Sequence, residues 1–259
     1  PRWLAMHGQK EKALEILTLA SGSQGANEVM VAIDQILKAD EKKSKVRFNE
    51  LFKPALKLVL FIGIVIAILQ QITGINAVFF YAPMIFEQTG IGVDASFSQA
   101  ILVGLTNLIF TLLAIWLIDK MGRKSLMYIG SIGYILSLLM VAYGFKTGAS
   151  AGFNLFFILS FIASHAVGQG AVIWVFISEI FPNSVRAAGQ AWGTGTHWVF
   201  AALITMLGEV VIDAFPGWTI FAFFAAFMLL QLLFTHFMMP ETKGVSLEEL
   251  QDRLSSEDA

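Results

Sequence analysis

The chain has 259 residues, of which 56% are hydrophobic and only 14% are charged, and its mean hydropathy is +0.71. Soluble globular domains usually contain about 25% charged residues, so this composition indicates a membrane protein. A net charge of −2 does not favour a nucleic-acid partner, and the absence of cysteine excludes disulfides and thiolate metal sites.

Six segments are long and apolar enough to cross a lipid membrane as helices, which takes about 20 residues each. In chain order they cover residues 56–81, 97–118, 126–145, 153–181, 187–212 and 218–239. The first, fourth and fifth contain polar residues, so we expect these three to face other helices on at least one side. The sequence therefore predicts an all-α membrane protein with a six-helix transmembrane bundle over residues 56–239.

The two ends of the chain differ in composition from the bundle. Residues 2–19 form an amphipathic pattern, residues 21–27 are rich in Gly and Ser, and Asn27 is a candidate cap for a second helix. Over residues 1–55 we expect a cytoplasmic region of short intracellular helices. Either a simple connector or a regulatory element agrees with this pattern. Residues 240–259 are predicted to form a cytoplasmic tail.

The positive charges predict the orientation of the bundle. With six spans, every lysine and arginine except Lys146 falls on the same side of the membrane. Loops rich in Lys and Arg stay on the cytoplasmic side. We therefore expect an integral protein of the cell membrane (the inner or plasma membrane), with both termini in the cytoplasm.

The six spans divide into two sets of three, in which the first and the fourth spans correspond. Both contain glycine-bearing interruptions, "TGIN" at residues 73–76 and "GQG" at residues 168–170. Interrupted helices at corresponding positions of two repeats are typical of a transporter's binding site near the membrane midplane.

Three amides, Gln70, Gln71 and Asn76, lie within seven residues of the first span. On a regular helix Gln70 and Asn76 would lie about 240° apart around the axis. If Gly74 lets the helix unwind, the amides can converge on one cavity. Amides both donate and accept hydrogen bonds, so they suit a neutral ligand covered in hydroxyls better than an ion.

Other spans supply similar groups. Asn107 lies in the second span, Gly170 and Trp174 share a face of the fourth, and His197 and Trp198 are adjacent in the fifth. Aromatic rings stack on the apolar face of a sugar. Together with the amides these groups predict a carbohydrate site. The alternative is that the polar groups only join helices and that Trp198 packs in the core.

Several motifs resemble those of one known family. The chain is similar to the sugar porter family of the major facilitator superfamily, which includes facilitative glucose transporters and bacterial xylose– and galactose–proton symporters. The resemblance rests on "PRWL" at residues 1–4, "QQITGIN" at 70–76, "DKMGRK" at 119–124, "WVFISEIFPNSVR" at 174–186 and "PETKG" at 240–244. It implies the C-terminal half of a twelve-helix major facilitator fold. The expected partner is the missing N-terminal six-helix half.

The resemblance also implies which residues bind the sugar: Gln70, Gln71, Asn76, Asn107, Gly170, Trp174, His197 and Trp198. The chain departs from the family at three positions. His197 stands where Asn or Gln is usual, Phe80 where Tyr is common, and Ala171 where the family has Pro. A neutral imidazole still donates one hydrogen bond and accepts another.

Charged residues at the cytoplasmic edge form a second candidate group. Similarity to the family implies that Asp119, Arg123, Glu179 and Arg186 join in a network that latches the two halves in the outward-facing state. The alternative is that these charges only anchor helix ends and set the orientation. His165, in the fourth span, is either a proton carrier or a hydrogen-bonded structural histidine.

The predicted function is transport of a monosaccharide, a hexose or a pentose, by alternating access. The alternative is a transporter-like sugar sensor that binds without transporting. An enzyme is not expected, because the sequence shows no paired carboxylates in mid-membrane and no nucleophile–base spacing. No metal or other cofactor is expected. Facilitated diffusion and proton symport both agree with these residues.

Overall fold

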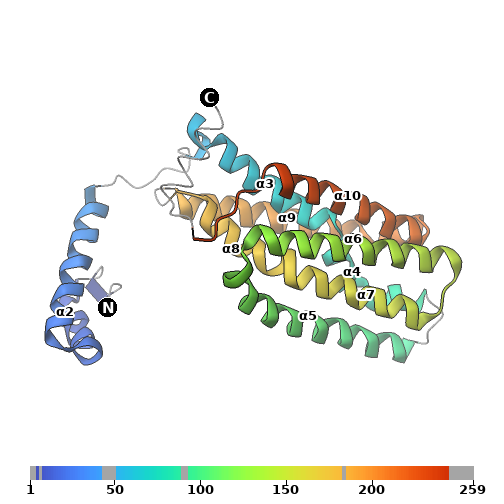
Figure 1. Ribbon diagram of the computed structural model, residues 1–259, viewed down its shortest axis with the longest axis horizontal. Helices are drawn as coiled ribbons and strands as arrows, with labels where there is room; N and C mark the ends of the chain where they lie inside the picture. Colours follow the sequence, from blue (N-terminus) through green and yellow to red (C-terminus); the bar gives the residue numbers. More distant parts are fainter. Residues whose placement is uncertain (1–3, 6–7, 43–50, 89–92, 183–184, 245–259) are drawn as a thin grey trace. The chain divides into compact units, whose positions relative to one another are not determined.

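The chain divides into two compact units, each described by itself (Figure 1). The computed structural model describes residues 4–5, 8–42, 51–88, 93–182 and 185–244. The units are Pro1–Phe48 and Asn49–Ala259. Their boundary lies a few residues before the predicted start of the bundle at residue 56. The side chain of Leu51 is fully buried in the core of the second unit, which explains why this short stretch belongs to it.

The first unit contains one helix with a break, α2 (Lys10–Lys42). Gly22 interrupts it with φ 72° and ψ 169°, a conformation open to glycine because it has no Cβ. Small and aliphatic side chains fill the core on both sides of the break, among them Ala13 and Ala26. A break within residues 21–27 is therefore confirmed. The predicted start of a second helix at Asn27 is wrong, because the chain is already helical there.

The second unit is a bundle of long helices (Figure 1). In chain order its elements are η2 (Pro54–Leu56), α3 (Lys57–Ile72), α4 (Ile75–Glu87), α5 (Val93–Met121), α6 (Arg123–Thr147), α7 (Ala151–His165), η3 (Ala166–Gly170), α8 (Ala171–Ile180), α9 (Arg186–Ala214) and α10 (Gly217–Phe237). Helices α3 and α4 form one span, and α7, η3 and α8 form another. The described residues thus contain six helical segments long and apolar enough to cross a membrane, which confirms the predicted all-α fold.

Both predicted interruptions are present. Helix α3 ends at Ile72, and Gly74 is left-handed with φ 90° before α4 begins. In the fourth span η3 is a π-helical turn, wider than the α-helices on either side of it. Such turns recur at functional sites in membrane and soluble helices alike.

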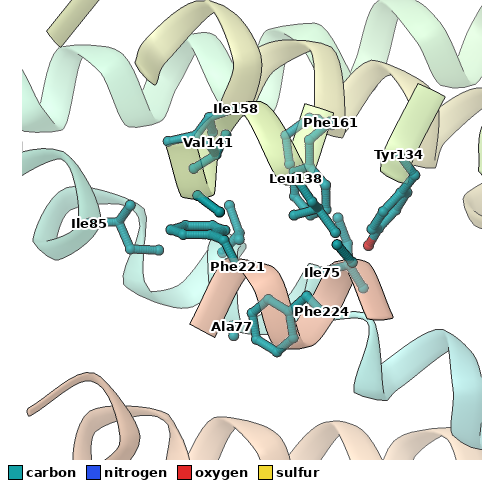
Figure 2. Close-up of a cluster of buried hydrophobic side chains, with 14 of the residues drawn as sticks. Ile75, Ala77, Ile85, Tyr134, Leu138, Val141, Ile158, Phe161, Phe221 and Phe224 are labelled. Atoms are coloured by element: carbon teal, nitrogen blue, oxygen red, sulfur yellow. The ribbon is translucent and has the colours of Figure 1, made fainter. Parts of the chain in front are cut away.

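Two apolar cores fill the bundle. One lies around α3, α8 and the start of α6 and includes Ile66, Phe176 and Phe181. The other joins α4, α6, α7 and α10, where Figure 2 shows Phe221 among side chains from the neighbouring helices. Buried polar side chains are present at both interruptions, among them Gln71 at the first and Gln169 at the second.

We expect Gly74→Ala to destabilise the bundle by about 2 kcal/mol, because an L-residue is strained at positive φ. The new methyl group would also meet the ring of Phe224. Thermal unfolding of the purified protein, followed by circular dichroism, measures the change. Gly152→Ala is the matched control: this helical glycine has open space around it, so the variant should be as stable as the parent or slightly more so. Equal melting temperatures for Gly74→Ala and the parent would contradict this account.

Candidate functional site

The break at Gly74 brings two of the predicted amides together. Gln71 lies in the last turn of α3 and Asn76 in the first turn of α4. The Asn76 side chain donates from Nδ2 to Oε1 of Gln71 at 2.6 Å. The left-handed turn at Gly74 thus brings the side chains of Gln71 and Asn76 together as one polar pair.

His197 of α9 completes this pair. The Nε2 atom of Gln71 lies 3.0 Å from Nδ1 and 2.9 Å from Nε2 of the imidazole, and it donates to the ring nitrogen that carries no proton. Gln71 is fully buried and His197 is only 5% exposed. The three side chains therefore form a connected group, Asn76–Gln71–His197, which we call the amide–histidine group.

Two indole rings flank the histidine. The ring centroids of Trp174 and His197 are 4.8 Å apart, and those of His197 and Trp198 are 5.3 Å apart. Trp174 is 41% exposed and Trp198 is 60% exposed. Apolar ring faces thus lie open beside buried hydrogen-bonding groups, an arrangement that suits a ligand with hydroxyls on its edge and C–H groups on its face.

Gln70 points elsewhere. Its Nε2 atom donates weakly to the carbonyl oxygen of Gln169 at 3.5 Å, and the side chain is buried. Gln169, in the π-helical turn, donates from its own side chain to Oγ of Ser131 at 2.9 Å. Sequence reasoning missed Gln169 and Ser131, because the "GQG" motif was considered only for its glycines.

Two further predicted residues lie outside the amide–histidine group. Asn107 is half-buried on α5, and within the described part of the chain it makes no hydrogen bond to another candidate residue. Gly170 is half-buried in η3, where a Cβ would lie 3.1 Å from the ring of His165. Gly170 thus leaves room for the neighbouring imidazole.

The serines near His165 bond to the backbone of their own helix. Ser164 donates to the carbonyl oxygen of Ser160, and Ser160 to that of Phe156. The ring of His165 is buried against Tyr134, with 5.9 Å between centroids. Its Nδ1 atom has no hydrogen-bond partner among the described residues. Short serine side chains bond more readily to their own helix than to a ring one residue further along.

The charged residues form a compact network at one end of the bundle. Arg123, at the first position of α6, donates from Nη2 and Nε to the two oxygens of Glu179 at 2.7 and 3.0 Å. Its Nη1 lies 3.3 Å from Oδ1 of Asp119, whose side chain is 81% exposed. The guanidinium of Arg186 donates to the carbonyl oxygen of Phe181. In the described structure Arg186 therefore does not pair with Glu179.

The "PETKG" segment extends this network, which the sequence analysis did not anticipate. Both oxygens of Glu241 accept backbone N–H groups at the start of α6, from Arg123 at 3.0 Å and Lys124 at 2.9 Å. Thr242 donates to Oε2 of Glu179 at 2.6 Å. A carboxylate on the free N–H groups of a helix start is a favourable partner for them.

The first comparison with known proteins gives the family. A family model described as "Sugar (and other) transporter" matches residues 1–254. The arabinose-proton symporter of Bacillus subtilis (strain 168) is 38% identical over 256 residues, 97% of this chain and 54% of that protein. The D-xylose-proton symporter of Escherichia coli (strain K12) is 33% identical, over 97% of this chain and 51% of that protein. The chain thus spans about half the length of the curated relatives it matches.

Solved structures agree with these relatives. The proton:xylose symporter XylE bound to 6-bromo-6-deoxy-D-glucose superposes with a TM-score of 0.74 at 32% identity, over 98% of this chain and 54% of that one. The inward open conformation of the xylose transporter XylE from E. coli gives a TM-score of 0.75 at 31% identity, over 98% and 51%. With six apolar helices, these motifs and a family match along nearly its whole length, the chain belongs to the sugar porter family of the major facilitator superfamily.

Proposed function

We propose that this protein moves a monosaccharide, a hexose or a pentose, across a membrane by alternating access, and that this chain is its sugar-binding half. The family is one of transporters rather than enzymes. The relatives include an arabinose-proton symporter, a D-xylose-proton symporter and a myo-inositol transporter. The single observation that carries the proposal is the amide–histidine group beside two open indole rings.

In this proposal Gln71 and Asn76 bind sugar hydroxyls while Trp174 and Trp198 cover the ring. Buried amides give selectivity, because a ligand without matching hydroxyls would leave them unpaired. His197 holds Gln71 in position and replaces the amide usual at its place. Gln70, Asn107 and Gly170 stay in the proposal as further sugar-binding residues, although Gln70 bonds to Gln169 in this structure.

The partner in transport is an N-terminal six-helix half, which supplies the other wall of the cavity. Relatives of about twice this length support that arrangement. The cell membrane is the proposed location, with both termini in the cytoplasm. The proton symporters among the relatives support coupling to a proton gradient.

The Arg123–Glu179–Asp119 network is the proposed latch of the outward-facing state. A bidentate guanidinium–carboxylate pair has a fixed geometry, so it holds only one arrangement of helix ends. Opening towards the cytoplasm would separate these groups, and sugar binding would shift the population between the two states. Arg186, which follows α8 in the chain, is also part of the proposed latch. In this structure its guanidinium donates to the carbonyl oxygen of Phe181.

We expect Gln71→Ala to weaken monosaccharide binding about tenfold, the effect of losing one or two hydrogen bonds to a buried amide. Titration of the purified protein with D-xylose, L-arabinose and D-glucose, followed by calorimetry, measures the affinity. Gln88→Ala is the matched control, because this exposed glutamine at the end of α4 takes no part in the proposed site.

Unchanged sugar affinity in folded Gln71→Ala would rule out the proposed site. Counterflow of the same sugars in vesicles, with and without a proton gradient, then separates the two functions. Counterflow by the protein joined to its N-terminal half supports transport. Binding without counterflow would instead support a sensor.

We expect Glu179→Gln to shift the protein roughly tenfold towards the inward-open state, because one neutral amide cannot replace the bidentate pair with Arg123. Asp119→Asn should shift it less, since Asp119 is largely exposed and lies farther from the guanidinium. The chain has no cysteine, so a single Phe80→Cys reporter can be labelled without background. Equal labelling rates of the Phe80→Cys reporter in the protein with Glu179 and in the Glu179→Gln variant would refute the latch.

A further inference from the structure

A cavity of about 480 Å³ lies between α4, α9 and α10. Sites for small organic ligands typically measure about 300–1,000 Å³. The described lining of this cavity shares no residue with the candidate sugar site. It therefore needs an explanation of its own.

The lining excludes a sugar as its ligand. Among the described residues of the wall, most are aliphatic side chains and phenyl rings, and Gln88 and Thr219 are the two with polar side chains. A hydroxylated ligand would lose its water here without gaining hydrogen bonds. A hydrocarbon chain makes no hydrogen bonds with water, so it would lose none by entering the cavity.

The cavity has a buried floor and an exposed rim. Val78 and Phe221 form part of the floor and are almost fully buried. Leu207 and Val211 of α9, with Phe215 directly after the helix, line the rim and are exposed. Helix α9 is one of the six helices long and apolar enough to cross a membrane, so the rim residues on it can contact lipid acyl chains.

Charged and aromatic groups stand at the end of the cavity near the start of α10. Gly217 lines the cavity, and a Cβ on it would lie 2.8 Å from the ring of Phe145. The next residues along are Lys146 and Trp218, with the ammonium 4.9 Å from the indole centroid. Tryptophan and lysine are typical of the membrane–water boundary, where lipid phosphates lie.

The carboxylates of Glu209 and Asp213 lie on the same end of α9, each next to a residue that lines the cavity. A cation and two carboxylates at one end complement a headgroup that carries both a negative phosphate and a positive ammonium group. We propose that this cavity holds an acyl chain of a zwitterionic membrane phospholipid, with its phosphate at Lys146.

The occupant would touch the ring that covers the break in the first span. Phe224 lines the cavity and packs directly on Gly74 (Figure 2 shows Phe224 beside Ala77, which also lines the cavity). On the α9 side, Gly208 lines the cavity and lies against the ring of Tyr81. The bound chain thus supports the packing that keeps the left-handed turn in place.

Photolabelling tests the proposal in the purified protein reconstituted into phosphatidylcholine vesicles. The probe is phosphatidylcholine with a diazirine in one acyl chain, and mass spectrometry locates the labelled peptides. We expect label on Val78 and Ile220 of the cavity wall. Ile204→Trp, which fills the cavity, should lower this labelling about tenfold, because the indole takes the space of the chain.

Leu203→Trp is the matched control, since Leu203 is adjacent on α9, exposed, and outside the described lining. It should label like the parent. Lys146→Gln, a surface change that leaves the core intact, should lower labelling about fivefold through loss of one lysine–lipid attraction.

If the parent and the folded Ile204→Trp variant are labelled equally at the cavity wall, the proposal is overturned. The label would then come from lipid around the bundle and not from a chain inside the cavity. Cavity residues that crosslink to another protein segment instead of the probe would overturn it as well. The labelling measurement needs no sugar, so its result does not depend on whether the proposed transport is correct.

Discussion

Backbone groups inside a membrane must find hydrogen-bond partners within the protein, and this constraint decides how the first span can be interrupted. At the break, the hydroxyl of Thr73 donates to the carbonyl oxygen of Gln70 at 2.7 Å. The hydroxyl of buried Tyr134 lies 3.4 Å from the carbonyl oxygen of Thr73. The N–H of Gly74 donates to Gln71. Several of the backbone groups at the turn thus have partners within the protein, and the amide–histidine group exists because the turn does.

The second interruption follows the same constraint by a different route. A π-helical turn keeps the helix continuous while it changes the direction of the side chains that follow. Gly168 lets α6 approach closely, since a Cβ there would lie 2.7 Å from the Cα of Gly130. Gln169 then reaches Ser131 across this narrow contact, and its backbone oxygen receives the amide of Gln70. Each of the two backbone irregularities thus holds buried polar side chains that bond to one another or to a neighbouring helix.

The helices and their interruptions could be predicted, because apolar length and glycine-bearing motifs are local properties of the sequence. The meeting of Gln71 and Asn76 followed from one left-handed glycine. The direction of Gln70 could not be predicted, since adjacent residues on a helix point to different sides and only the partner helix decides between them. The pairing of Arg123 with Glu179 rather than of Glu179 with Arg186 depends on how α6 and α8 end in space. The role of Glu241 was missed because a helix start and a distant carboxylate share no sequence pattern.

The short stretch after α10 has a mechanical consequence. Glu241 is bonded to the backbone at the start of α6, Thr242 is bonded to Glu179 on α8, and Lys243 donates to the carbonyl oxygen of Lys120 on α5. The ends of α5, α6, α8 and α10 are thereby held together at this end of the bundle. Any movement that parts these helices has to break several bonds at once, so release here is an all-or-none event and does not proceed helix by helix.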